Sequence, residues 1–473
     1  MQAVAHRREE PLFRTTVRFG TPLVVAMALG SVFNLVDLFI VAKWKSPEVA
    51  VAAVTIGSLV NSIPMIIFNG IVNAMLALIA RYHGLGRNKR ASVATGQGLI
   101  LTLLLSLLFG IPPWIFAEPI SVALGAKGDV ITPATDYLAI MSAGTVTMFL
   151  LLTVTGALRA VGNSLVPLIL LGGANLFNVI LDIWFIFGGF GLPEMGVAGA
   201  AWATVVARGI FALAGLALLY RGFLGIKIRR WLWRGQMIRS MLAIGVPSCI
   251  QWLVRMAAYL YTLRFVEVAA PKALPHVADA VTNAQAAFGI GLRLDSLALF
   301  SGFGWGAAAA TLVGQNLGRG RVDRAVRASW IALGLNMAMM CVFAATYVLF
   351  ADFLLGLMGF DVGVGTAASA NADIVHALGR TYLYVASSGF VFLAVAVVLS
   401  QALAGAGATK FPLLIEVVAY GAIGYPLTAW AADNAGRFGL RGLWLAAVAI
   451  HLAVAIVYVL WFRFGSWARK EIR

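Results

Sequence analysis

The chain has 473 residues, of which 61% are hydrophobic and only 11% are charged. A soluble domain usually carries about 25% charged residues, so this composition excludes an ordinary soluble protein. The mean hydropathy of +0.91 and the uncharged runs of about 20 to 28 residues predict helices that cross a lipid bilayer. The net charge of +16 does not indicate a nucleic-acid partner, because the basic residues lie in short loops between apolar runs, as orientation signals do.

Twelve membrane spans are predicted, six in each half of the chain. They cover approximately residues 19–42, 52–80, 96–117, 135–158, 165–189, 197–220, 241–266, 281–313, 328–350, 379–402, 411–431 and 440–462. If the N-terminus is cytoplasmic, the inside segments hold 24 Lys and Arg residues and the outside segments hold 7. This bias predicts that both termini face the cytoplasm, with the protein in the plasma or inner cell membrane.

The two halves of the sequence repeat one another. At an offset of 234, segment 68–91 aligns with segment 303–325, which places Gly70 on Gly304 and Gly84 on Gly318. Three further segments match in the same order, namely 157–168 with 402–413, 20–22 with 245–247 and 196–203 with 439–446.

This repeat predicts the organisation of the protein. Six spans is an even number, so both halves enter the membrane from the same side and are related by an axis along the membrane normal. We predict an N-terminal lobe of residues 1–221, a basic cytoplasmic linker of residues 222–238 and a C-terminal lobe of residues 239–473. The substrate path is expected in a cleft between the lobes, as in other transporters built from parallel repeats.

Two spans of the first half carry carboxylates, which are costly in a membrane and are therefore functional candidates. Asn34 and Asp37 lie three residues apart in "FNLVD", and Asn175, Asn178 and Asp182 share one helix face in "NLFNVILD". Both acids lie about 17 residues, or roughly 25 Å, from the inner end of their helix. The equal depth predicts one shared site. It could hold Na⁺ at Asp37, Asn178 and Asp182, hold a proton, or be a structural hydrogen-bond network.

The second half buries different ionisable residues. Arg255 lies in the middle of the seventh span, and Arg293 and Asp295 lie in the eighth. Residues two apart on a helix do not face each other, so Arg293 and Asp295 are expected to pair with other helices, and Arg255 is a possible partner for Asp295. These three are secondary site candidates. Glu416, shallow on the inner side, could be a structural residue or part of a gate.

Two prolines at equivalent positions are candidate hinges. Pro22 and Pro247 each follow a Gly-x pair near the start of the first helix of their half. A proline inside a helix removes a backbone hydrogen bond and bends the helix. Such bends are plausible hinges, although packing alone can also explain them.

Taken together, these segments resemble the multidrug and toxic compound extrusion (MATE) family. The resemblance covers essentially the whole chain and is most specific in "LVGQNLGRGRVDRA", "ALRAVGNSLVPL", "ALAGAGATKFP" and "GVAGAAWAT". Asp37 matches the first-helix acid of a prokaryotic branch of that family, and Pro22 matches its helix-bending proline. Asn178 and Asp182 match the fifth-helix pair of that branch, and Thr204 matches a sixth-helix hydroxyl.

The sequence also departs from the family pattern. Arg255 stands near the position where another branch has a seventh-helix acid, and "YLYVASSGFVFLAVAVVLS" lacks the tenth-helix acid of that branch. A tyrosine that often precedes the first-helix acid by four residues is Phe33 here. A cation site of that second type is therefore not expected in the C-terminal lobe.

The resemblance implies an all-α polytopic membrane protein with twelve transmembrane helices in two pseudo-symmetric six-helix lobes. It also implies a monomeric secondary antiporter that exports cationic or amphipathic organic solutes and drugs, coupled to H⁺ or Na⁺ entry. The alternative is a flippase of the same superfamily for a lipid-linked oligosaccharide or lipid, with Arg255 and Arg293 as candidate pyrophosphate ligands. A channel would need a continuous polar lining, and only scattered polar groups are present.

The sequence does not favour an enzyme. It contains no phosphate-binding loop of the Gly-x4-Gly-Lys-Ser/Thr type, so nucleotide hydrolysis of that kind is excluded. The five histidines form no cluster with metal-ligand spacing. No cofactor and no nucleic-acid partner are expected, and the bilayer is the expected surroundings.

Overall fold

The computed structural model describes the chain except residues 1–10, 190, 192, 229–232, 358–366 and 470–473. Ten of the described helices are long and apolar enough to cross a membrane. Two more spans arise from helix pairs that are bent by 43° and by 52° at a single break. Counting each bent pair once gives twelve spans, which confirms the prediction.

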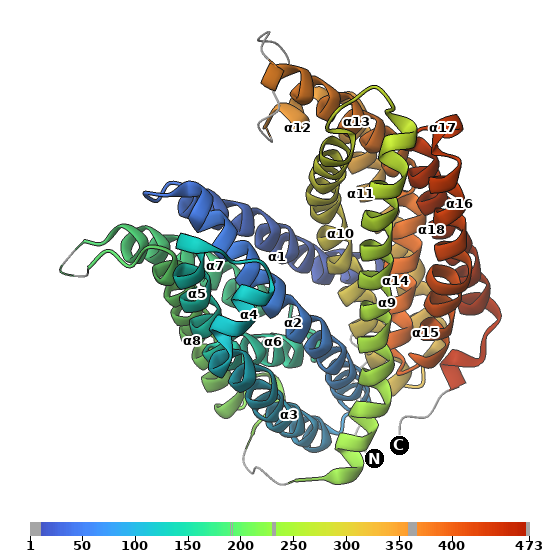
Figure 1. The fold of residues 1–473 in the computed structure, drawn as a ribbon. Helices are drawn as coiled ribbons and strands as arrows, with labels where there is room; N and C mark the ends of the chain where they lie inside the picture. The colour runs from blue at the N-terminus through green and yellow to red at the C-terminus, as the bar shows by residue number, and fades with distance from the viewer. Residues whose placement is uncertain (1–10, 190, 192, 229–232, 358–366, 470–473) are drawn as a thin grey trace, which may run out of the picture.

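The helices form two bundles (Figure 1). The first bundle contains α1 Leu12–Val41, α2 Pro47–Gly84, α3 Asn88–Ile115, α4 Ala117–Ala123, α5 Ile131–Ala143, α6 Thr145–Ala160, α7 Leu165–Phe187 and α8 Gly196–Tyr220. The second contains α9 Gly235–Ala273, α10 Ala280–Gly318, α11 Val322–Leu349, α12 Ala351–Leu357, α13 Ala367–Ser388, α14 Phe390–Gly405, α15 Lys410–Glu416, a π-helical stretch Val417–Gly424, α16 Tyr425–Asp433, α17 Ala435–Phe438 and α18 Arg441–Phe464.

The repeat is visible in the irregular parts of the helices. The short helices α4 and α12 begin 234 residues apart, each directly after a long span. The bends between α5 and α6 and between α13 and α14 fall at Gly144 and Gly389, which are 245 residues apart. The two offsets are the same as those of the sequence matches. The exact lobe boundaries at residues 222–238 remain a prediction.

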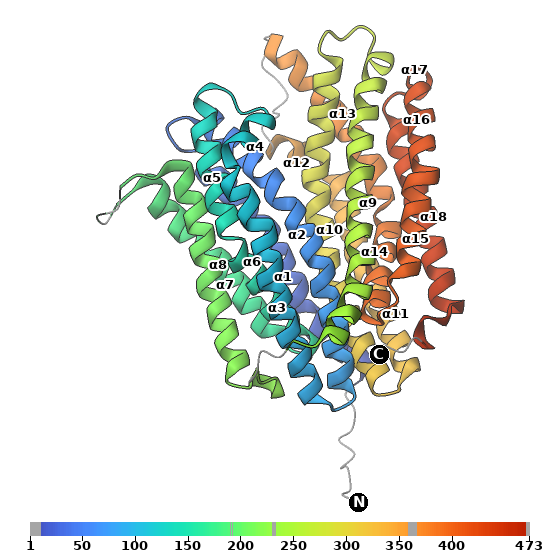
Figure 2. The ribbon, with the colours of Figure 1, turned by 60° about the horizontal axis from the view of Figure 1, so that its bottom comes forward.

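The two bundles lie side by side (Figures 1 and 2). In Figure 1 their ribbons lie close together at the lower end and spread apart toward the upper end. Packing between the bundles is made mainly by α1 against α10 and by α2 against α9 and α10. These four helices therefore separate the interior of one bundle from that of the other.

Glycines bring these four helices into backbone contact. A Cβ atom on Gly304 of α10 would lie 2.5 Å from the backbone of Val24 in α1. A Cβ atom on Gly70 of α2 would lie 2.8 Å from the carbonyl oxygen of Gly245 in α9. Non-bonded carbon contacts need about 3.5 Å, so larger residues cannot fit without moving a helix. Gly70 and Gly304 are equivalent positions of the repeat, so the contact is formed twice.

The C-terminal ends of α2 and α10 meet in the same manner. A Cβ atom on Gly84 would lie 2.2 Å from the carbonyl oxygen of Gln315, and one on Gly318 would lie 2.3 Å from that of Arg81. Such reciprocal contacts are expected where a twofold axis passes between two helices. We call the whole contact the glycine seam, with its members Gly70, Gly84, Gly245, Gly304 and Gly318.

Candidate functional site

Two acidic side chains meet inside the first bundle. Helices α1 and α7 pack against each other, and the carboxyl groups of Asp37 and Asp182 interact directly. Asp182 is fully buried. The shared site that was predicted from equal helix depth is thus present as a geometric cluster.

An amide and a hydroxyl complete the cluster. The Nδ2 atom of Asn178 lies 3.2 Å from Oδ1 of Asp182 and 3.3 Å from Oγ1 of Thr204, and it donates to both. The hydroxyl of Thr204 in turn donates to the carbonyl oxygen of Ala200 at 3.0 Å. Four of the five principal site residues predicted from the sequence therefore lie together. We call this set, Asp37, Asn178, Asp182 and Thr204, the carboxylate cluster.

The fifth predicted residue, Asn34, is placed differently. Its side chain is exposed and makes no hydrogen bond to the residues that the structure describes. The amide that does lie between α1 and α7 is Asn175, whose Nδ2 atom is 3.9 Å from the position of a Cβ on Gly30. Helical spacing places Asn34 near Asp37 but does not determine which side of α1 meets α7.

Two oxygens of the carboxylate cluster lack donors. Oδ1 of Asp37 and Oδ2 of Asp182 are buried and accept no hydrogen bond within the described part of the chain. An ionised carboxylate oxygen that is buried without a donor is strongly unfavourable. A bound proton or a bound cation removes this penalty, because either one neutralises the charge and uses the free lone pair.

Sequence analysis missed two neighbours of the carboxylate cluster. Arg208 lies one helical turn after Thr204 on α8 and interacts electrostatically with Asp37 and Asp182. Its Nη1 atom is 3.6 Å from Sδ of Met148. Tyr137 on α5 is buried and lies in the electrostatic range of Asp37. Arg208 could have been predicted, because it is a charged residue inside a span. No feature of the sequence distinguishes Tyr137 from the other tyrosines.

The second bundle buries an ion pair. Nε of Arg255 donates to Oε2 of Glu416 at 2.8 Å, and Nη2 of Arg255 donates to Oε1 of the same carboxylate. Tyr458 also donates to Oε1, at 3.0 Å. Glu416 is fully buried, whereas 23% of the Arg255 side chain is exposed.

The predicted pairing of Arg255 with Asp295 was wrong. Asp295 accepts a hydrogen bond of 2.5 Å from the hydroxyl of Tyr382 instead. Arg255 turns toward α15, which packs against α9, while Asp295 turns toward α13. Arg293 is exposed and forms no ion pair with the described residues. Spacing along one helix correctly separated Arg293 from Asp295 but did not identify their neighbours.

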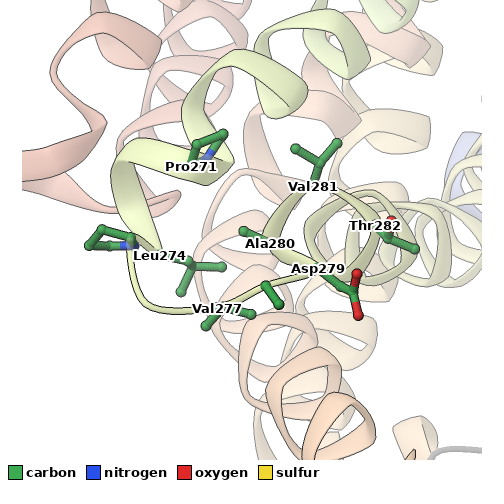
Figure 3. A pocket seen from close by; sticks show the side chains of 9 residues that line it. Pro271, Leu274, Val277, Asp279, Ala280, Val281 and Thr282 are labelled. Carbon is green, nitrogen blue, oxygen red and sulfur yellow. The ribbon is translucent and has the colours of Figure 1, made fainter.

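A separate pocket lies at the turn between α9 and α10 (Figure 3). Its volume is about 220 Å³, and Asp279 is the ionisable side chain among the residues that line it. Asn371 donates to that carboxylate at 3.2 Å. None of the predicted site residues lines this pocket. Within the described part of the chain, no three His, Cys, Asp or Glu side chains group together as a metal site would require.

Known proteins resemble this chain over most of its length. The family model described as MatE matches residues 22–184 and 279–430. A probable multidrug resistance protein NorM of Thermotoga maritima is 23% identical over 467 residues, covering 96% of this chain and 93% of that protein. The multidrug resistance protein PmpM of Pseudomonas aeruginosa is 26% identical over 467 residues, covering 96% and 91%.

A solved structure has the same fold. It is described as the outward-facing conformation of a multidrug resistance MATE family transporter of the MOP superfamily. It superposes with a TM-score of 0.85 at 22% identity and covers 97% of both chains. The twelve spans and this superposition place the chain in the fold class of that membrane protein. The family match, which spans both bundles, shows that the chain belongs to the MATE family of multidrug efflux transporters.

Proposed function

We propose that this protein is a secondary antiporter that exports amphipathic organic solutes in exchange for H⁺ or Na⁺. The two orphaned oxygens of Asp37 and Asp182 carry the proposal, because a buried carboxylate pair without donors must be neutralised in part of its cycle. The names of the relatives, which are multidrug resistance proteins, support organic small molecules as the substrates. No cofactor is needed for this chemistry.

The charges of the site indicate how many ions move. Two carboxylates and the guanidinium of Arg208 together carry one net negative formal charge. One proton or one Na⁺ is therefore enough to neutralise the site. Without Arg208 the same site would need two monovalent cations. We infer that one cation is exchanged in each cycle, and a reversal-potential measurement in liposomes tests this number directly.

Coupling follows from linkage between the ion and the solute. If binding of a cation at Asp37 weakens solute binding, solute must weaken cation binding by the same factor. Pro22 lies inside α1, the helix that carries Asp37, and provides a bend through which the site can act on the contacts of α1 with α10. The protein works as a monomer in this scheme, with each chain holding one carboxylate cluster.

The decisive experiment uses purified protein in liposomes. Dye efflux driven by an imposed pH gradient is compared with efflux driven by an imposed Na⁺ gradient. The coupling ion is the one whose gradient drives transport, and Asp37→Asn, which mimics the protonated acid, should lose that transport while still inserting. Wild-type efflux by Asp37→Asn under the effective gradient would contradict the proposal.

Membrane orientation is tested separately. The charge bias of the loops supports cytoplasmic termini and a location in the cell membrane. Lys127 and Lys89 are both exposed and lie at opposite ends of the spans. In a background without native cysteines, an impermeant maleimide added outside intact cells should label a cysteine at 127 and not one at 89. The reverse pattern would refute this orientation.

The flippase alternative has less support. A pyrophosphate site requires several unpaired cations that converge on one point. Arg255 is neutralised by Glu416, which leaves Arg293, exposed on another helix, as the member of the two candidates that is unpaired among the described residues. The second bundle therefore lacks the concentration of positive charge that a dianionic lipid carrier would require.

A further inference from the structure

The ion pair with Glu416 occupies only one of the two hydrogen-bonding edges of the Arg255 guanidinium. A guanidinium has two edges that can each hold a carboxylate, one made by Nε and Nη2 and one made by Nη1 and Nη2. Glu416 occupies the first edge. Within the described part of the chain, Nη1 has no protein acceptor, and 23% of the Arg255 side chain is exposed.

Aromatic rings lie next to this open edge. The Cζ atom of Arg255 is 5.5 Å from the ring centroid of Trp252. Trp252 is 5.1 Å from Phe303, and Phe303 is 6.1 Å from Phe300, both between ring centroids. Phe300 is 40% exposed although it lies in the middle of the eighth span. We call Trp252, Phe300 and Phe303 the aromatic platform.

The platform faces the other bundle. Cys249 of α9 donates from its thiol to the carbonyl oxygen of Ile67 in α2 at 2.8 Å, and Trp252 follows on the same side of α9, three residues later. Gly304 of α10 touches Val24 of α1, and Phe300 lies one turn before it. Positions three or four residues apart lie on one side of a helix. The aromatic platform therefore borders the region between the bundles, just beyond the glycine seam, and the guanidinium of Arg255 lies beside it.

The first bundle has no equivalent of this arrangement. At the repeat offsets of 225 and 245, Gly30 stands where Arg255 does and Leu171 stands where Glu416 does. A pair required only to hold the fold would not need to leave one edge of its guanidinium beside exposed rings. The pair also differs from the carboxylate cluster in what it offers to a ligand. The carboxylate cluster offers negatively charged acceptors, whereas the guanidinium offers positively charged hydrogen-bond donors.

We propose that the open edge of Arg255 and the aromatic platform form a substrate subsite for aromatic carboxylates, including zwitterions. The carboxylate of the ligand accepts hydrogen bonds from Nη1 and Nη2, and its ring stacks on Trp252 or Phe300. Arginine suits this task because its planar donors match a carboxylate and because it stacks beside aromatic rings. Because this one guanidinium is shared with Glu416, it suits a ligand with a single negative charge. This subsite names a substrate class and so rests on the proposed export of organic solutes.

Binding without any gradient tests the subsite. Purified protein in nanodiscs is titrated with dansylglycine and with dansylglycinamide, two fluorescent probes that differ only by a carboxylate and an amide. Wild-type protein should prefer dansylglycine by about tenfold, the effect of a hydrogen bond to a charged group. Because no gradient is present, a failure of ion coupling at Asp37 would leave this preference intact, and loss of the preference would not affect the coupling test.

Variants separate the subsite from general stability. Glu416→Gln keeps Arg255 and removes the competing carboxylate, so its preference for dansylglycine should equal or exceed that of the wild type. The double variant Arg255→Gln with Glu416→Gln avoids an unpaired buried charge and should bind both probes equally. Trp252→Leu should weaken both probes by a similar factor.

The result that overturns the subsite is equally direct. A wild-type protein without preference between the probes contradicts it. An unchanged preference in the double variant, with dansylglycinamide binding retained as proof of folding, also contradicts it. In that case the carboxylate of the probe is recognised elsewhere.

Discussion

The two bundles share one architecture but treat buried charge in opposite ways. In the first, Asp37 and Asp182 each retain a buried oxygen without a donor. In the second, Glu416 is held by Arg255 and Tyr458, whereas Asp295 accepts from Tyr382 through Oδ2 and keeps Oδ1 without a donor among the described residues. The same fold therefore brings two acids together in the first bundle and gives each acid of the second bundle a separate partner on another helix. Ion exchange and solute recognition can accordingly reside in different halves of the chain.

The bundles share their helix bends and the glycine contacts between helices. The bends at Gly144 and Gly389 fall at equivalent positions, and Gly70 and Gly304 make equivalent contacts across the glycine seam. These features shape the helices and their packing, and the repeat preserves them. The ionisable residues are not preserved by the repeat, so the chemistry is asymmetric on a symmetric scaffold.

The sharpest test of this difference compares acids of the two bundles. Asp182→Asn should reduce gradient-driven efflux to the level of empty liposomes, because the exchangeable cation loses its ligand. Asp295→Asn should keep most of the transport, since this acid is paired with the hydroxyl of Tyr382 and not with a second carboxylate. The Asp37→Asn, Asp182→Asn double variant should be little worse than either single one, because members of one unit are not additive.

A result in which Asp295→Asn is the inactive variant would reverse the roles of the two bundles. Surface expression and size-exclusion profiles of both variants are the controls. They show whether the loss concerns transport or folding.

The next largest effect should be on stability in the second bundle. Removing one partner of a buried ion pair costs about 3–5 kcal/mol, because the other charge remains buried and unpaired. Arg255→Met alone, which strands the fully buried Glu416, should therefore lower the unfolding temperature in detergent clearly. Adding Glu416→Leu should recover most of the loss. If the single variant is as stable as the wild type, the pair contributes nothing to the fold of this bundle.

A smaller effect is expected at the glycine seam, the feature common to both bundles. Gly304→Ala places a Cβ against the backbone of Val24, whereas Gly334→Ala on α11 meets nothing within 4 Å. Overpacking of this kind costs about 1–3 kcal/mol, so Gly304→Ala should favour separation of the bundles and slow transport about tenfold. Gly334→Ala should be neutral.

Cysteine labelling provides the structural readout for the seam. Cys249 is buried at the contact with α2, and Cys341 is exposed. In a Cys341→Ser background, maleimide should react with Cys249 faster in Gly304→Ala than in Gly334→Ala. Equal rates would show that the seam tolerates the added methyl group.

The smallest effect concerns an exposed cluster of the first bundle, next to the loops that follow α1 and α7. Lys45 and Trp44 donate to Glu194, each at 2.6 Å, and these hydrogen bonds hold the pKa of Glu194 below its usual value, with Lys45 as the main cause. A lowered folded-state pKa stabilises the protein above the unfolded pKa, and this contribution is lost as pH falls through the folded value.

The corresponding measurement is a pH series of unfolding temperatures. Glu194→Gln should be slightly less stable than the wild type near pH 7, and the difference should vanish in acid. The second bundle has a comparable exposed pair, Lys272 and Asp433 at 3.0 Å. The variant Asp433→Asn is therefore measured beside Glu194→Gln, so that the same change is compared in both bundles. A difference for Glu194→Gln that grows on acidification would contradict a stabilising role for the ionised carboxylate.

Much of the fold could be predicted from the sequence, because a bilayer leaves few choices. Hydropathy indicated the twelve spans, and the matched glycines indicated the repeat. The meeting of Asp37 and Asp182 followed from equal depth in two helices of one half. Depth along the membrane normal is readable from residue number, since each helix rises by about 1.5 Å per residue.

The partners of the buried charges were not predictable in the same way. Choosing between Asp295 and Glu416 for Arg255 requires knowing which helices surround α9 and how each is rotated. Hydrophobic periodicity is weak in helices that are apolar on all sides, so the rotation is not encoded in a pattern. Arg208 and Tyr137 were overlooked for the same reason, because their approach to Asp37 depends on helix packing.

The glycine seam has a consequence for energy efficiency. Where the backbones of α2 and α10 touch at Gly84 and Gly318, no space is left for a water molecule, which needs a cavity of its own and two or more polar partners. A hydronium or hydrated sodium ion cannot pass such a barrier while it is closed. In the proposed antiport the gradient would therefore not be dissipated by ions that leak along this contact between turnovers.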